Sequence, residues 1–146
     1  MTNRIYTIGY GSRPPHEVFA ILDDLGAILV DIRFSAWGKP GWKLFELQRA
    51  LGARYLHVKA LGNAAYKTGG MEIANYEQGK AVLAGLDRPA VLLCACHRPE
   101  GCHRTVVGDM LRRDGFTVTE LYQAPAAAQA AAPAQSDPDE QLTLWG

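Results

Sequence analysis

Residues 90–104 read AVLLCACHRPEGCHR, and this segment determines the fold class that we predict for the chain. Its first five residues are wholly apolar, which is typical of a central parallel strand that is buried on both faces. All three cysteines of the chain follow, at Cys94, Cys96 and Cys102, and an amphipathic helical pattern begins after Gly101. The segment therefore predicts a buried strand, a turn rich in thiols and imidazoles, and a helix N-terminus, which favours anions and ionised thiols.

Apolar runs alternate with helical periodicities on both sides of this segment. The predicted strands span residues 5–8, 28–32, 55–58, 90–94 and 117–121, with one helix between each consecutive pair. Ser12 is the expected N-cap of the first helix, and Asn75 with Gln78 the expected capping pair of the third. This alternation predicts one three-layer α/β domain over residues 1–122, with a mostly parallel five-stranded sheet. The preferred strand order is 3-2-1-4-5, and the last strand, which is polar at alternate positions, is expected at an edge.

The composition sets limits on the function. The formal net charge is zero, which argues against electrostatic capture of nucleic acid by the whole surface but leaves a local patch open. Neither a signal peptide nor an apolar stretch long enough to cross a bilayer is visible, so no membrane partner is expected. Three clustered cysteines indicate reduced thiols rather than a disulfide framework, and we expect a cytoplasmic protein.

Three polar loops are expected to converge at one place. The preferred order puts the switch point between the first and fourth strands, and ligands bind parallel sheets at the carboxyl ends of the strands beside such a point. The segment Gly9–Arg13 follows the first strand, Asp31 and Arg33 end the second, and the cysteine-rich turn follows the fourth. We therefore predict a single site that these three loops form.

With these loops in place, the chain resembles the bacterial family filed as domain of unknown function 488. The likeness extends from about residue 5 to residue 122. It is carried by residues 6–11 (YTIGYG), residues 30–33 (VDIR), residues 61–62 (LG), and the strand that leads to Cys102-His103-Arg104. The family typically has His where this chain has Tyr10. The resemblance implies an α/β fold and the positions of the site, but it implies no reaction.

The residue types of the site allow two interpretations. In the functional one, Cys102 is a nucleophile, His103 or His97 moves a proton and Asp31 is a general base. The predicted anion- or substrate-binding residues are Tyr10, Gly11, Ser12, Arg13, Arg33, Cys96, His97 and Arg104. In the structural interpretation, Cys102 is buried, Arg104 pairs with Asp31 inside the domain and His103 caps the helix.

Zinc is a further alternative for the same turn. Cys96, His97, Cys102 and His103 have the ligand types that zinc prefers, although their spacing matches no familiar zinc pattern. The main prediction therefore contains no metal and no cofactor, and the zinc-stabilised domain remains open beside it.

Residues 35–43, SAWGKPGWK, bring two tryptophans and two lysines into the loop after the second strand. Aromatic rings interleaved with cations can stack on single-stranded bases and hold them. We predict a nucleic-acid rim at Trp37, Lys39 and Trp42, which Lys59, Tyr66 and Lys67 extend. The alternative is a loop that folds back and covers the core with its indoles.

The C-terminal part has a different composition. Residues 123–139 are rich in Ala and Pro and are expected to form a flexible linker, and residues 140–146 carry a short apolar motif. This motif resembles the one by which bacterial repair and replication proteins bind the sliding clamp. The resemblance implies partner contacts by Gln141, Leu142, Leu144 and Trp145, with Trp145 in the place of the usual Phe. The alternative is a terminal segment that packs on its own domain.

Taken together, these patterns favour an enzyme of DNA or nucleotide metabolism, repair included, that acts on a phosphate-bearing substrate. The first alternative is a non-catalytic nucleic-acid or nucleotide binding module that the tail tethers to the clamp. The second is a zinc-stabilised domain without pocket chemistry. The sequence indicates neither the reaction nor the oligomeric state.

Overall fold

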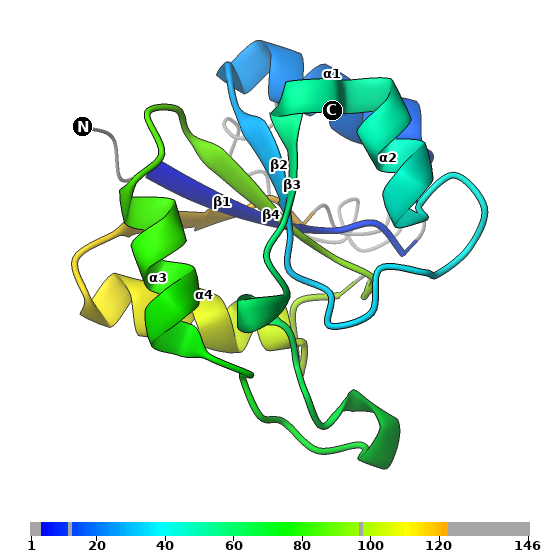
Figure 1. The fold of residues 1–146 in the computed structure, drawn as a ribbon. Helices are drawn as coiled ribbons and strands as arrows, with labels where there is room; N and C mark the ends of the chain where they lie inside the picture. The colour runs from blue at the N-terminus through cyan, green and yellow to red at the C-terminus, as the bar shows by residue number, and fades with distance from the viewer. Residues whose placement is uncertain (1–3, 12, 97, 123–146) are drawn as a thin grey trace, which may run out of the picture.

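A computed structural model of the chain describes residues 4–11, 13–96 and 98–122, which form an α/β domain (Figure 1). The strands are β1 (Arg4–Gly9), β2 (Ile28–Asp31), β3 (Tyr55–His57), β4 (Ala90–Cys94) and β5 (Thr117–Glu120). Every pairing between them is parallel. The helices are α1 (Pro15–Leu25), α2 (Leu44–Leu51), α3 (Tyr76–Ala84) and α4 (His103–Arg113), with short 3₁₀ turns at Gly52–Arg54, Lys59–Leu61 and Tyr66–Thr68. The predicted α/β class and the parallel five-stranded sheet are confirmed.

The strand order corrects the prediction. The sheet runs β3-β2-β4-β1-β5, so that β4 rather than β1 occupies the centre. Ala90 of β4 is in register with Ile28 on one side and with Ile5 on the other. The physical reason is burial, because all five residues of β4 are buried whereas β1 begins with an exposed arginine. The wholly apolar strand takes the position that is covered on both faces and paired on both edges.

Two helices cover each face of the sheet (Figure 1). Alternate strand residues separate into two cores, as the pleat requires. The core beneath α1 and α2 includes Ile8, Leu22, Leu29, Leu47, Val91 and Leu93. The core beneath α3 and α4 includes Ile5, Val30, Leu83, Leu92, Val107 and Leu111. The neighbouring strands β1 and β4 lead to helices on opposite faces, β1 to α1 and β4 to α4. The loops that follow these two strands therefore diverge, and the switch point lies between β1 and β4 as predicted.

The helix ends follow the sequence signals with one exception. The N-cap of α1 is Pro14 and not Ser12, because the two prolines start the helix with Pro15 at its first position. The backbone N–H of Gln78 donates to Asn75 Oδ1 at 3.2 Å, which confirms the predicted cap of α3. None of the helices in the described part of the chain has the length and hydrophobicity that a membrane crossing needs.

Candidate functional site

The three predicted loops do meet at the carboxyl edge of the sheet. The backbone N–H of Tyr10 donates to the carbonyl of Cys94 at 3.0 Å, and that of Ile32 donates to the carbonyl of Leu93 at 3.1 Å. A Cβ atom at Gly9 would overlap the carbonyl oxygen of Cys96, so this close approach requires glycine. The turn after β1 and the thiol-rich turn after β4 are therefore in direct contact.

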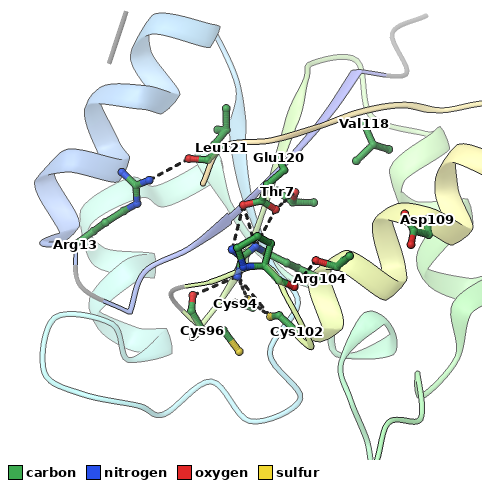
Figure 2. A network of polar contacts seen from close by, with 12 residues as sticks. Thr7, Arg13, Cys94, Cys96, Cys102, Arg104, Asp109, Val118, Glu120 and Leu121 are labelled. Carbon is green, nitrogen blue, oxygen red and sulfur yellow. Dashed lines mark hydrogen bonds and ion pairs between the residues drawn. The ribbon is translucent and has the colours of Figure 1, made fainter. Parts of the chain in front are cut away.

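Arg104 lies fully buried at the centre of this contact (Figure 2). Its Nε and Nη2 atoms donate to the carboxylate of Glu120 on β5, each with a contact of 3.0 Å. Its Nη1 atom donates to Cys94 Sγ at 3.1 Å, to the Cys96 carbonyl at 3.2 Å and to Cys102 Sγ at 3.4 Å. The guanidinium thus links α4, β5 and the thiol-rich turn, as a structural side chain does.

A second buried ion pair lies at the end of β2. Asp31 is fully buried, and its two carboxylate oxygens accept from Arg33 Nε at 2.8 Å and from Arg33 Nη2 at 2.6 Å. The Tyr55 hydroxyl donates to the same carboxylate at 2.6 Å. Burial and the hydrogen bond to Asp31 raise the pKa of Tyr55, which keeps this hydroxyl a neutral donor. Asp31 is therefore fully engaged inside the protein.

These pairs bear directly on the predicted anion site. Arg104 pairs with Glu120, which corrects the alternative in which its partner was Asp31. Arg13 also has internal partners, because its Nη2 atom donates to the carbonyl of Leu121 at 3.0 Å (Figure 2). The described guanidiniums of the predicted site thus bind acceptors of the protein itself, and this geometry gives no support to their anion-binding role.

The other predicted residues of the turn differ in accessibility. Cys102 is buried, and the half-buried His103 makes a hydrogen bond of 2.9 Å between its Nε2 atom and the carbonyl of Ile32. Cys96 is exposed to solvent. Ser12 and His97 lie outside the described residues. Of the four groups to which chemistry was assigned, the structure encloses Asp31 and Cys102 and engages His103, while His97 lies outside the described residues.

The sulfur atoms of Cys94, Cys96 and Cys102 lie within 4.8 Å of one another and form the one candidate metal cluster among the described residues. Cys94 Sγ and Cys102 Sγ are 2.9 Å apart. Two thiolates that bind the same tetrahedral zinc ion at ~2.3 Å lie roughly 3.8 Å apart. In addition, the positive Arg104 contacts both of these sulfur atoms. The observed arrangement therefore does not fit a zinc ion held between them.

An open pocket lies farther along the same edge, beyond the ends of β2 and β3. Its volume is about 570 Å³. Its aromatic and basic lining residues are Phe34, Trp37, Phe45, His57, Lys59, Tyr66 and Lys67, and small or aliphatic side chains complete the wall. We call this feature the aromatic pocket. It contains no acidic side chain among its lining residues.

The rings of the aromatic pocket are unusually accessible. Trp37 is 62 % exposed, Phe45 51 % and Tyr66 46 %. Lys59 Nζ lies 4.5 Å from the ring centre of Phe34, whose ring centre is 6.2 Å from that of Tyr66. Exposed rings that gather around one pocket are typical of binding surfaces. The lysines beside the rings give this surface a positive charge.

The structure brings only part of the predicted rim together, and it does not test whether these residues bind nucleic acid. Trp37, Lys59, Tyr66 and Lys67 come together in the aromatic pocket. Trp42 does not, because it is 1 % exposed and its ring stacks on Tyr10 with centres 4.3 Å apart. Its assignment to the rim is wrong, and the alternative of an indole that covers the core applies to it.

Two further predicted residues also lie outside the aromatic pocket. The exposed Lys39 donates from Nζ to the carbonyl of Gly11 at 2.9 Å, which connects the tryptophan loop to the turn after β1. Tyr10 is buried beneath Trp42, and its hydroxyl accepts from Arg33 Nη1 at 3.4 Å. These contacts hold the loop against the domain, so Tyr10, Gly11 and Lys39 support the wall of the aromatic pocket.

Phe34 and Phe45 are the functional candidates that the sequence analysis missed. Phe45 lies beside the apolar stripe that Leu44, Leu47 and Leu51 form on α2, and its exposure follows from that position. A large aromatic residue outside the buried stripe of an amphipathic helix was the available signal. Phe34 follows directly after Arg33, and no periodicity marks it.

A comparison of the chain with protein-family models, curated proteins and solved structures finds no match. The likeness to the domain of unknown function 488 therefore stays a prediction, and the functional argument depends on the geometry of the site.

Proposed function

We propose that this protein binds single-stranded nucleic acid, with one base held in the aromatic pocket. The observation that carries the proposal is the joint exposure of Trp37, Phe45 and Tyr66 around a cavity whose charged side chains are lysines. Exposed rings supply stacking faces for a base, and lysines at the rim supply contacts for the flanking phosphates.

The size of the cavity suits this ligand. A volume of about 570 Å³ lies within the ordinary range of small-ligand pockets and accommodates a single nucleotide. Lys43 Nζ lies 5.5 Å from the ring centre of Trp37, so a positive charge accompanies the most exposed ring. Since the chain as a whole has zero net charge, binding depends on this local patch.

We favour the binding module over the enzyme because the described side chains with a predicted chemical role, Asp31, Cys102 and His103, are enclosed or engaged within the protein. Asp31 and Cys102 are buried, and the imidazole of His103 is engaged by a backbone carbonyl. His57 lines the aromatic pocket, but its Nε2 atom makes a hydrogen bond of 2.8 Å with the carbonyl of Arg33. No reaction is therefore part of the proposal.

The test is the affinity of the full chain for a fluorescent oligothymidylate. Trp37→Ala is expected to raise the Kd about tenfold, because stacking on one base contributes ~1–3 kcal/mol. Met71→Ala is the matched control, since Met71 is also large, apolar and exposed but does not line the aromatic pocket. Equal affinities of the two variants would overturn the proposal.

The lysines give a second arm of the same experiment. Lys59→Gln is expected to reduce the slope of log Kd against log salt by about 0.7, the contribution of one phosphate contact on a single strand. Lys80→Gln is the control, because Lys80 lies on α3 beside Glu77 and Asp114 and away from the aromatic pocket. A slope that responds equally to both changes would mean that no local patch is used.

The C-terminal motif adds a partner to this proposal. Residues 140–146 lie outside the described residues, and we propose from their sequence that they bind the sliding clamp and thereby keep the nucleic-acid binding domain near DNA. Deletion of residues 140–146 is expected to abolish co-elution with the clamp and to leave the Kd for oligothymidylate unchanged. Co-elution that survives the deletion would refute the partner and not the binding function.

A further inference from the structure

The three cysteines share one cluster but have different surroundings. Cys94 ends β4 and is fully buried, and Cys102 is the buried N-cap residue of α4. Cys96 lies between them in sequence and is exposed to solvent. All three sulfur atoms lie within 4.8 Å of one another. The cluster thus combines one sulfur that a dissolved reagent can reach with two sulfurs that are in reach of the first.

A buried positive charge borders this cluster. Arg104 Nη1 donates to both buried sulfur atoms and to the carbonyl of Cys96 (Figure 2). Hydrogen bonds from Cys102 and Cys94, together with the charge of Arg104, lower the pKa of Cys96 to about 3. Burial raises the pKa of Cys94 well above its usual range. These surroundings therefore favour the thiolate form at the accessible sulfur and the neutral thiol at the buried Cys94.

We propose that the exposed Cys96 is a hydroperoxide-reactive cysteine and that Cys102 converts its oxidised form into an intramolecular disulfide. This proposal is independent of nucleic-acid binding, because the cluster lies at the ends of β4 and α4 and none of its cysteines lines the aromatic pocket. Cys102 is preferred to Cys94 as the second thiol for a reason of backbone freedom. Cys94 lies in the central strand, whereas Cys102 follows a turn that ends in Gly101 with a φ of 74°.

The chemistry balances in two steps. In the first, the Cys96 thiolate attacks one oxygen of the peroxide, a sulfur–oxygen bond forms, and the oxygen–oxygen bond breaks. The sulfur is oxidised by two electrons to a sulfenic acid, and the leaving hydroxide or alkoxide takes a proton from solvent and becomes water or an alcohol. In the second, the Cys102 sulfur attacks the Cys96 sulfur, the sulfur–sulfur bond forms, and hydroxide leaves as water with the thiol proton. A dithiol reductant restores both thiols.

The experiment treats the full reduced chain with an equivalent of hydrogen peroxide, blocks the remaining thiols and maps the peptides by mass spectrometry. The expected product contains a Cys96–Cys102 disulfide and a free Cys94, and dithiothreitol reverses it. Cys102→Ser is expected to stop at a sulfenic acid on Cys96 that dimedone traps. Cys94→Ser is the matched control, because it removes a thiol of the same cluster and is expected to leave the disulfide in place.

Three results would overturn the proposal. They are a disulfide that joins Cys94 to Cys102, peroxide consumption that Cys96→Ser does not slow, and stoichiometric zinc that must be removed before any thiol reacts. A measurement on the unaltered chain guards against variants that fail to fold. Alkylation of Cys96 by iodoacetamide is expected to proceed at a nearly constant rate from about pH 5 to pH 8, because the thiolate is already formed. A rate that rises about tenfold per pH unit in this range would contradict the proposal.

Discussion

Two regions at the carboxyl edge of the sheet differ in what they do with their polar and aromatic side chains. At the ends of β1, β2 and β4, the charged residues Asp31 and Arg104 are fully buried and paired within the protein. In the aromatic pocket beyond β2 and β3, the rings of Trp37, Phe45 and Tyr66 face solvent. Aromatic side chains, which normally pack in the core, are thus exposed in the aromatic pocket. Charged side chains, which normally lie on the surface, are buried in the other region.

The difference has a simple energetic origin. A buried charge costs several kcal/mol unless a partner compensates it, and here each buried guanidinium has a carboxylate within 3.0 Å. Exposed rings carry no comparable penalty that the domain itself must offset, but they retain surface that a ligand can remove from water. The region of buried ion pairs therefore stabilises the domain, and the aromatic pocket is the region that is accessible to a ligand.

The largest expected effect separates the two tryptophans of the same loop. Trp42→Ala is expected to lower the free energy of unfolding by about 4 kcal/mol, because it empties a fully buried site stacked on Tyr10. Trp37→Ala is expected to change it by less than about 0.5 kcal/mol, because that ring faces solvent. Urea unfolding measures both, and similar losses in the two variants would remove the distinction between the regions.

A slightly smaller effect is expected from the buried carboxylate. Asp31→Ala leaves Arg33 and the Tyr55 hydroxyl without their acceptor in the interior, and the expected loss is about 3 kcal/mol. Asp23→Ala is the control, because Asp23 pairs with Arg54 on the surface and its loss costs less than about 1 kcal/mol. If both variants unfold at the same urea concentration, the buried Asp31–Arg33 pair does not stabilise the domain more than a surface pair does.

The smallest effect is expected at Asp114, a solvent-exposed carboxylate that directly follows α4 and accepts hydrogen bonds from α3. Hydrogen bonds from Tyr76 at 2.6 Å and from Lys80 at 3.3 Å lower its pKa. A lowered folded-state pKa means that the stabilisation is present above the ordinary pKa of Asp and is lost as the pH falls through the folded value. Asp114→Asn is therefore expected to be slightly less stable than the original chain at pH 7 and equal to it in strong acid. Thermal melts across this range measure the difference, and a gap that widens in acid would contradict the sign.

The sequence predicted the layers of the fold better than the order of its strands. Periodicity located the strands and helices because each one buries a single apolar stripe or run. The order depends on which strand is buried on both edges, and the charged start at Arg4 against the wholly apolar Ala90–Cys94 was the available signal. Both strands were placed near the centre, but only β4 has the composition of the innermost position.

The site was predicted in part for a similar reason. Local composition identified the loop that carries Trp37 and Trp42, but a long-range contact with Tyr10 decides which of them is buried. Likewise, the residue types around Arg104 indicate chemistry, whereas its actual partner, Glu120, comes from the edge strand at the end of the described chain. Pairing across the sheet is tertiary information, and no local spacing contains it.

The central position of β4 also governs when this domain can assemble. β1 and β2 do not pair with each other, and each instead pairs with β4, whose residues come late in the chain. During synthesis, β1 therefore has no inner strand to pair with until β4 has left the ribosome. Until then the β2–β3 pair has an unpaired edge at β2. The centre of the sheet therefore cannot form before β4 is available, and a chain cut short before residue 90 leaves β1 and the β2–β3 pair without the strand that joins them.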